Sequence, residues 1–278
     1  MKTLIRFADW WNSRKVQNFY IYDEFPAEHK DALLKMINTY LTLEEEESEA
    51  ALRMSAIGKP IVDLAYSLVD EDKREYSSRG QYWSISMGIY GEALVKMLML
   101  ANGFHYTLSQ ERVKLGPLVG HIDGVVDDTT VFDIKFMSYT YYNQFVSKPN
   151  DERGYLTQLS VYRKALGLPK AAFLCINKVT GQCRVVKLSQ KKYVECLHEV
   201  KAKLKLLKQI HQSQNVALVE PPLPRLNKAG KYVVPDIMKY SPNVVDIYGH
   251  YELVDVEYFQ QKWPSAWAKL TELGKPPW

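Results

Sequence analysis

The chain has 278 residues, of which 46% are hydrophobic and 24% charged, and its formal net charge at pH 7 is +4. This composition is ordinary for a soluble globular protein, and the length suits one large domain or two small ones. No apolar run reaches the roughly 18 residues of a membrane span, and Met1–Lys15 lack the apolar core of a secretory signal. We therefore expect a cytoplasmic protein with no membrane partner. The mild positive charge is compatible with a polyanionic partner without identifying one.

The cysteine content also excludes some site classes. Cys175, Cys183 and Cys196 are an odd count without C-x-x-C spacing. This pattern favours reduced thiols and argues against a zinc or iron–sulfur cage.

The predicted elements alternate between helices and strands. The first helical pattern follows Pro26, and the carboxylates after it, Glu44–Glu47 and Glu49, would fan around a helix as a solvated face rather than converge on a metal. Periodicity and turn residues predict further helices over 57–69, 90–101, 156–166 and 191–212, and strands over 118–126, 130–136, 171–179 and 183–188. The last ~65 residues are rich in Pro and Tyr and weakly periodic, which indicates an irregular wrap. This order predicts an α/β (α+β) fold with a mixed sheet.

The strand VFDIKFM carries two charges in an apolar setting. Alternation places Val131, Asp133 and Lys135 on one face, and Phe132 and Ile134 on the other, apolar face. Asp133 and Lys135 then either form a half-exposed salt bridge, which contributes about 0–1 kcal/mol, or face a cleft.

Asp123 in GHIDG strengthens the cleft interpretation. The predicted hairpin turn at 127–129 places Asp123 and Asp133 on neighbouring strands, and Gly120 and Gly124 permit close approach. Two neighbouring carboxylates repel each other unless a cation or proton lies between them. Oxygen ligands at an open site suit Mg²⁺ or Mn²⁺.

These residues match a known signature. Asp123 followed by Asp133-Ile134-Lys135 resembles the motif of PD-(D/E)XK nucleases. YLTQLSVY, with Gln158 and Tyr162, and MGIYGEALVKML, with Glu92, are similar to the flanking motifs of the RecB-type and lambda-type exonuclease branch. The resemblance covers roughly residues 53–166. Lys59-Pro60 stands where the cluster-bearing members have their first cysteine, so no iron–sulfur cluster is expected.

The resemblance implies a restriction-endonuclease-like core, in which a central mixed β-sheet is flanked by helices. The domain organisation that we expect is an N-terminal helical extension over 1–52, a nuclease core over 53–212 and a C-terminal extension over 213–278 packed on that core. A phage or a bacterium would be the source of such a chain.

The resemblance also implies roles for individual residues. Glu92, Asp123, Asp133 and the backbone carbonyl of Ile134 would ligate one or two Mg²⁺ or Mn²⁺ ions. Lys135 would hold the attacking water by electrostatic positioning. The products would carry a 5′-phosphate and a 3′-hydroxyl.

The remaining candidates each have a structural alternative. Gln158 and Tyr162 either bond the substrate backbone or orient Lys135, or they only pack their helix on the sheet. Arg53 and Ser55 either contact a terminal phosphate or, for Ser55, cap a helix. His121 either bonds substrate or is a satisfied structural histidine.

The expected function is that of a metal-dependent DNA exonuclease in recombination, repair or DNA turnover. Its partners would be single-stranded DNA or duplex ends, a recombination or single-strand-binding protein, and further copies of the chain. The alternatives are an endonuclease with the same fold, structure-selective or nonspecific, and a non-catalytic nucleic-acid-binding protein on a nuclease fold. Exo versus endo action, polarity and strand preference stay open.

Overall fold

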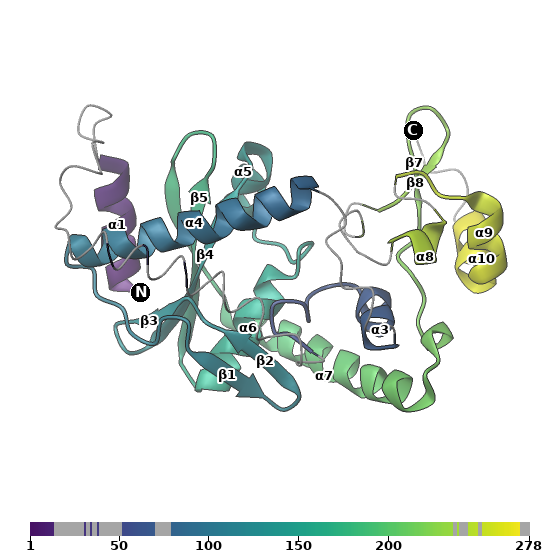
Figure 1. Ribbon diagram of the computed structural model, residues 1–278, viewed down its shortest axis with the longest axis horizontal. Helices are drawn as coiled ribbons and strands as arrows, with labels where there is room; N and C mark the ends of the chain where they lie inside the picture. The colour runs from purple at the N-terminus through teal and green to yellow at the C-terminus, as the bar shows by residue number, and fades with distance from the viewer. Residues whose placement is uncertain are drawn as a thin grey trace. The chain divides into compact units, whose positions relative to one another are not determined.

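A computed structural model describes residues 1–13, 31, 34, 38, 52–69, 79–235, 238, 244–249 and 252–272, with side chains from 86 onward in the helix that begins at 79 (Figure 1). The chain divides into two units: Met1–Ser55 with Trp83–Leu197, and Ala56–Tyr82 with His198–Trp278. The helix predicted after Pro26, the Glu44–Glu49 run and most of the 1–52 extension lie outside the described residues. The predicted domain boundaries stay predictions.

A four-stranded mixed sheet forms the centre of the first unit. Its order is β3 (Gly124–Val126), β4 (Thr130–Met137), β5 (Lys170–Asn177) and β6 (Cys183–Lys187), and β4–β5 is the parallel pair between two antiparallel ones. A parallel pair needs a long crossover, and here α5 (Tyr139–Ser147) and α6 (Tyr155–Leu166) supply it. The predicted α/β class with a central mixed sheet flanked by helices is confirmed.

The continuous strand predicted over 118–126 is wrong. β2 (Leu118–His121) pairs with β1 (Arg112–Leu115), and β3 starts only at Gly124 in the four-stranded sheet. The sequence gives no sign of this break, because the residues on both sides of it are apolar. Ile122, which lies between the two strands, is itself fully buried. The change of sheet leaves Asp123 on an unpaired stretch just before β3.

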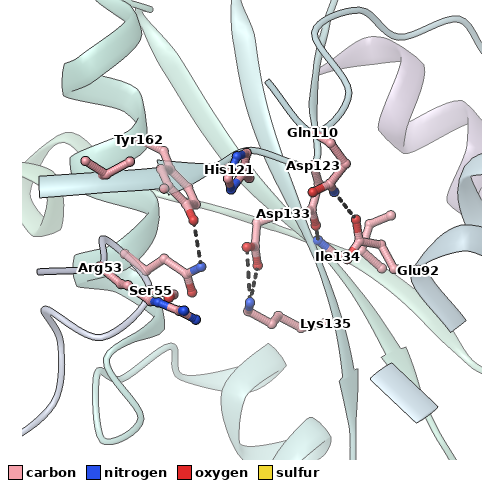
Figure 2. Close-up of a pocket in the computed structure, with 13 residues that line it drawn as sticks. Arg53, Ser55, Glu92, Gln110, His121, Asp123, Asp133, Ile134, Lys135 and Tyr162 are labelled. Carbon is pink, nitrogen blue, oxygen red and sulfur yellow. Dashed lines mark hydrogen bonds and ion pairs between the residues drawn. The ribbon is translucent and has the colours of Figure 1, made fainter. Parts of the chain in front are cut away.

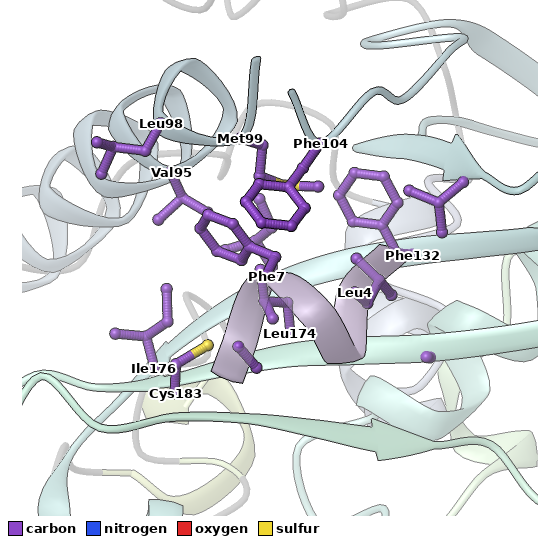
Figure 3. Close-up of a cluster of buried hydrophobic side chains, with 14 residues drawn as sticks. Leu4, Phe7, Val95, Leu98, Met99, Phe104, Phe132, Leu174, Ile176 and Cys183 are labelled. Atoms are coloured by element: carbon purple, nitrogen blue, oxygen red, sulfur yellow. The ribbon is translucent and has the colours of Figure 1, made fainter. Parts of the chain in front are cut away.

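One face of the sheet is covered by α1 (Lys2–Ser13) and α4 (Arg79–Ala101). Figure 3 shows Phe7 of α1 between Met99 of α4 and Leu174 of β5. Phe132 and Ile134 point into this cluster, which confirms the predicted apolar face of β4. This apolar cluster covers one face of β4, and β4 carries Asp133 and Lys135 on its other face.

The opposite face is covered by the crossover helices. Phe145 of α5 packs edge-on against Phe173 of β5, and α6 contacts both β4 and β5. Asp151, which precedes the N-cap Gly154 of α6, satisfies a donor of the first turn, because its Oδ1 accepts from the backbone N–H of Leu156 at 2.6 Å. Gly167, with φ 65°, ends the helix where the sequence predicts.

Two predicted helices differ from the observed ones at their start. α4 begins at Arg79 rather than at residue 90, and α3 (Ile61–Val69) begins after Pro60 rather than at residue 57. Proline fixes φ and lacks an N–H, so it favours the position next to a helix start. The helix predicted over 191–212 is confirmed as α7 (Gln190–Ser213), which starts in the first unit and continues in the second.

The second unit is more regular than the predicted irregular wrap. It contains the 3₁₀ turn η4 (Val216–Leu218), the ladder of β7 (Arg225–Leu226) with β8 (Tyr232–Val233), and the helices α8 (Val244–Tyr248), α9 (Val256–Lys262) and α10 (Pro264–Glu272). Elements this short show no recognisable periodicity, which is why sequence pattern missed them. In the part of the chain that the structure describes, no helix combines the length and apolarity that crossing a membrane requires.

Two glycines of α4 give a matched test of how closely that helix approaches β4. A Cβ on Gly91 would lie 2.6 Å from the Phe136 ring, whereas a Cβ on Gly88 would meet nothing within 4 Å. We expect Gly91→Ala to lower the free energy of unfolding by about 1–3 kcal/mol through overpacking. Gly88→Ala should raise it by about 0.5–1 kcal/mol, because alanine costs less backbone entropy in a helix.

Chemical denaturation of both variants checks this prediction. Equal effects of the two substitutions would contradict the close approach of α4 to Phe136.

Candidate active site

A pocket of about 230 Å³ lies in the first unit, beside the ends of β2, β3 and α6. All ten residues predicted for the site line it, together with Gly120, which the sequence analysis named only for close approach, and two residues that it did not select. The predicted ones are Arg53, Ser55, Glu92, His121, Asp123, Asp133, Ile134, Lys135, Gln158 and Tyr162; the others are Gln110, Val119 and Gly120. Figure 2 shows Asp133 and Lys135 in the middle, with Tyr162 and Arg53 on one side and Glu92 on the other.

The two aspartates come together through the start of the β3–β4 hairpin. Gly124 pairs with Phe132, and the Ile134 N–H donates to Oδ2 of Asp123 at 2.6 Å. This bond ties the unpaired Asp123 to the strand that carries Asp133. The side chains of both aspartates are buried, with 8% and 2% of the residue exposed.

Asp133 and Lys135 form an ion pair on the same face of β4. Lys135 Nζ lies 3.1 Å from Oδ1, to which it donates a hydrogen bond, and 2.8 Å from Oδ2. Only the Oδ1 contact has hydrogen-bond geometry, so Oδ2 is a buried carboxylate oxygen without a hydrogen-bond donor. The face is less open than predicted, because Asp133 is buried and only Lys135 reaches solvent, with 19% of its side chain exposed.

An aromatic ring also holds the Lys135 ammonium. Nζ lies 4.8 Å from the centroid of the Tyr155 ring, at the start of α6. Burial is the largest influence on the pKa of Lys135 and works to lower it, but the charge of Asp133 together with Tyr155, Asp123 and the hydrogen bond to Asp133 holds that pKa above its ordinary value. Lys135 is therefore an ammonium that donates hydrogen bonds.

Glu92 is the third carboxylate of the pocket and comes from α4. Lys96 Nζ lies 2.6 Å from its Oε1, one helical turn further on, and Gln110 Nε2 donates to the same oxygen at 2.9 Å. Sequence analysis missed both partners. The pair Glu92 and Lys96 at i, i+4 was the available signal for Lys96, whereas Gln110 precedes the unpredicted β1 and has no such signal.

The carboxylates shift one another's protonation. Burial, and then the charges of Glu92 and Asp133, raise the pKa of Asp123 well above its ordinary value. Burial likewise raises the pKa of Asp133, although Lys135 works against this. Lys135 lies against Asp133 and Lys96 against Glu92, and Arg53 also lines the pocket.

Gln158 and Tyr162 face the pocket from α6. Gln158 Nε2 lies 3.3 Å from the Tyr162 hydroxyl, and both residues are buried. Gly120 makes room for the tyrosine, because a Cβ there would lie 2.9 Å from the Tyr162 ring. Gly120 thus allows the Tyr162 side chain to pack closely. Gln158 and Tyr162, both predicted for the site, are brought together at the pocket.

Arg53 and Ser55 reach the pocket through a short pairing with β2. The Met54 N–H donates to the Val119 carbonyl at 2.8 Å, and Arg53 forms a parallel bridge with Val119. The helix-cap alternative for Ser55 is wrong, because α3 begins only at Ile61. His121, at the end of β2, lines the same pocket.

The chemistry of the oxygen atoms that line the pocket suits a hard divalent cation. Buried carboxylates with raised pKa values and a carboxylate oxygen without a donor are what Mg²⁺ or Mn²⁺ would satisfy. Among the described residues, however, no three His, Cys, Asp or Glu side chains form a ready metal site. Glu92 is bonded to Lys96 and Gln110 instead. The predicted metal ligands therefore stay a prediction.

The cysteines lie away from the pocket lining. Cys175 in β5, Cys183 in β6 and Cys196 in α7 are all buried, and burial raises the pKa of Cys183 to about 12. The expected absence of an iron–sulfur cluster stays a prediction.

The sequence matches no protein-family model and no curated protein. Among solved structures, the chain is similar to an alkaline exonuclease from Laribacter hongkongensis, with 17% identity, a TM-score of 0.40, and 61% of this chain and 95% of the other covered. Another structure of that enzyme contains dAMP and gives 15% identity and a TM-score of 0.37, covering 58% and 93% of the two chains. A phage-related exonuclease from Haemophilus somnus gives 12% identity and a TM-score of 0.43, covering 59% and 96%. Likeness at these TM-scores does not by itself assign an activity to this chain.

The raised pKa of Asp123 predicts that its charged carboxylate lowers the stability of the folded chain. Because the pKa is higher in the folded than in the unfolded chain, stability falls as the pH rises above the ordinary aspartate range. Asp123→Asn keeps an oxygen that can accept from the Ile134 N–H but removes the charge. In EDTA at pH 8 we expect it to raise Tm by roughly 2–4 °C, which corresponds to about 1 kcal/mol.

Thermal unfolding from pH 4 to pH 8 measures this effect, and the gain should shrink toward low pH. A variant less stable than the wild type across the whole range would show that the Asp123 carboxylate stabilises the fold.

Proposed function

We propose that the chain is a metal-dependent DNA nuclease of the PD-(D/E)XK type, and specifically an exonuclease of the lambda-type branch without an iron–sulfur cluster. The single observation that carries this proposal is the convergence of Asp123, Asp133, Lys135 and Glu92, from three separate elements, in one pocket. The motif that suggested the family and the geometry of the pocket support the same assignment by independent routes.

Each residue has a task in phosphodiester hydrolysis. Asp123, Asp133 and Glu92, with the Ile134 carbonyl, would hold Mg²⁺ or Mn²⁺. The bound ion would neutralise the phosphate and acidify a water. Lys135 stays protonated, so it orients the attacking water and offsets developing negative charge as a donor. Gln158 and Tyr162, bonded to each other, orient the substrate backbone, and Arg53 supplies a fixed positive charge beside it.

A time course on DNA with and without ends tests the exonuclease assignment. Linear DNA labelled at its ends and covalently closed circles are incubated with the protein and Mg²⁺. Release of mononucleotides from the linear DNA alone supports an exonuclease. Equal cutting of circles would indicate an endonuclease, and binding without cutting of either would indicate a non-catalytic DNA-binding protein.

Replacing Lys135 should abolish cleavage. We expect Lys135→Ala to lower kcat by about 10²-fold or more, as loss of an electrostatic donor does. The variant should also be less stable than the wild type in EDTA, because the buried Asp133 loses its ion-pair partner. Mg²⁺ should recover part of that stability.

The matched control is Lys187→Ala, which removes an exposed lysine from β6. It should leave both cleavage and stability unchanged. Wild-type cleavage by Lys135→Ala would falsify the assignment of the pocket as the active site.

Cleavage should require Mg²⁺ or Mn²⁺ and be poorly supported by Ca²⁺. Ca²⁺ accepts a looser shell and acidifies bound water less, so it should permit DNA binding with little turnover. Initial rates across the three ions, with binding measured in parallel, check this expectation. Cleavage that persists in excess EDTA contradicts the metal-dependent mechanism.

A further inference from the structure

Gln110 joins two parts of the pocket that come from different elements. Its side chain donates to Oε1 of Glu92 on α4 at 2.9 Å. Its backbone N–H donates to the carbonyl of Ile122 at 2.9 Å, and Ile122 directly precedes Asp123. One residue therefore connects the helix that carries Glu92 with the stretch that carries Asp123 (Figure 2).

The backbone around Gln110 is held in an unusual conformation. Gln110 has φ 55° and Leu108 has φ 54°, both in the left-handed region that non-glycine residues rarely adopt. A non-glycine residue in this region is strained and persists only where surrounding contacts enforce its conformation. Here the Ile122 N–H donates to the Glu111 carbonyl at 3.2 Å, so hydrogen bonds on both sides of Ile122 hold the segment in place.

Lys96 complements Gln110 on the same carboxylate oxygen. Its side chain is fully buried and its Nζ lies 2.6 Å from Oε1 of Glu92. A buried ammonium costs several kcal/mol unless a carboxylate and hydrogen bonds compensate for it. Lys96 thus places a positive charge against Oε1 of Glu92, and Gln110 supplies a neutral donor that directs the same oxygen.

We propose that Gln110 is a positioning residue that fixes Glu92 relative to Asp123 and so sets the affinity of the pocket for a divalent cation. This proposal rests on the proposed function, in which Glu92 and Asp123 hold such an ion. Partners that hydrogen-bond a ligating carboxylate typically change metal affinity or activity by 10–100-fold when they are removed. Gln110 is neutral, so its removal tests orientation without changing the charge of the pocket.

The direct test is calorimetric titration of Gln110→Met with Mn²⁺ in the absence of DNA. Methionine has a similar length and no donor. We expect the variant to bind Mn²⁺ about 10-fold or more weakly than the wild type. Gln209→Met, the same change at an exposed position of α7, is the matched control and should bind as the wild type does.

A second variant controls for a folding defect that a substitution of Gln110 could cause through its left-handed backbone conformation. Asn adopts this conformation more readily than most residues, so Gln110→Asn should preserve the backbone while its shorter amide no longer reaches Glu92. It should weaken Mn²⁺ binding to the same extent as Gln110→Met. Wild-type affinity in both variants would overturn the proposal.

A double-mutant cycle shows whether Gln110 acts through Glu92. In a Glu92→Gln background, Gln110→Met should weaken Mn²⁺ binding less than twofold, because the carboxylate that Gln110 orients is already absent. Equal effects of Gln110→Met in both backgrounds would overturn the proposed route through Glu92, even if the affinity itself falls.

Cleavage assays separate this proposal from the proposed function. A wild-type protein that cleaves DNA, together with Gln110 variants of unchanged Mn²⁺ affinity, overturns the role of Gln110 alone. Mn²⁺ binding that depends on Gln110, without cleavage of any DNA, upholds that role and overturns the nuclease assignment. A wild-type protein that neither binds Mn²⁺ nor cleaves DNA overturns both.

Discussion

Carboxylates at short range inside a protein repel one another, and this repulsion governs the arrangement around the pocket. Asp123 is buried beside Asp133 and Glu92, and its pKa is raised as a result. The chain responds with two ammonium groups, Lys135 against Asp133 and Lys96 against Glu92. A nearby positive charge compensates more strongly in a poorly hydrated pocket than at a surface. The charged form of Asp123 remains unfavourable, and the rest of the fold must offset this energy.

The packing of the first unit explains how this energy is tolerated. β4 has Phe132 and Ile134 in the apolar cluster on one face and Asp133 on the other, so the cluster anchors the strand that bears the charge. β4 also pairs along its length with β5. A site that costs stability is thus built on the central strands of the sheet, where backbone and side-chain positions are best determined.

The sequence pattern predicted those pairs of site residues that become neighbours through the local periodicity of a strand or a helix. Asp133 and Lys135 share a face because strand side chains alternate, and Gln158 meets Tyr162 because helical residues four apart are neighbours. The break in the chain at Ile122 and Asp123 was not predictable in this way, because an apolar run looks the same whether it stays in one sheet or changes to another. Gln110 was missed for a related reason, since its contacts arise only after β1 and α4 have been brought together.

The wall of the pocket, formed by Arg53, is attached to the fold differently from its floor, which is formed by Asp133 on β4. Arg53 and Met54 connect to the rest of the first unit through a short pairing with Val119 at the edge of the β1–β2 ladder, whereas Asp133 belongs to a strand paired on both sides. Segments with few backbone hydrogen bonds open at lower free energy than central strands, and their amide protons exchange sooner. The pocket therefore combines a floor on a strand paired on both sides with a wall held by one short backbone pairing and by the fully buried side chain of Met54.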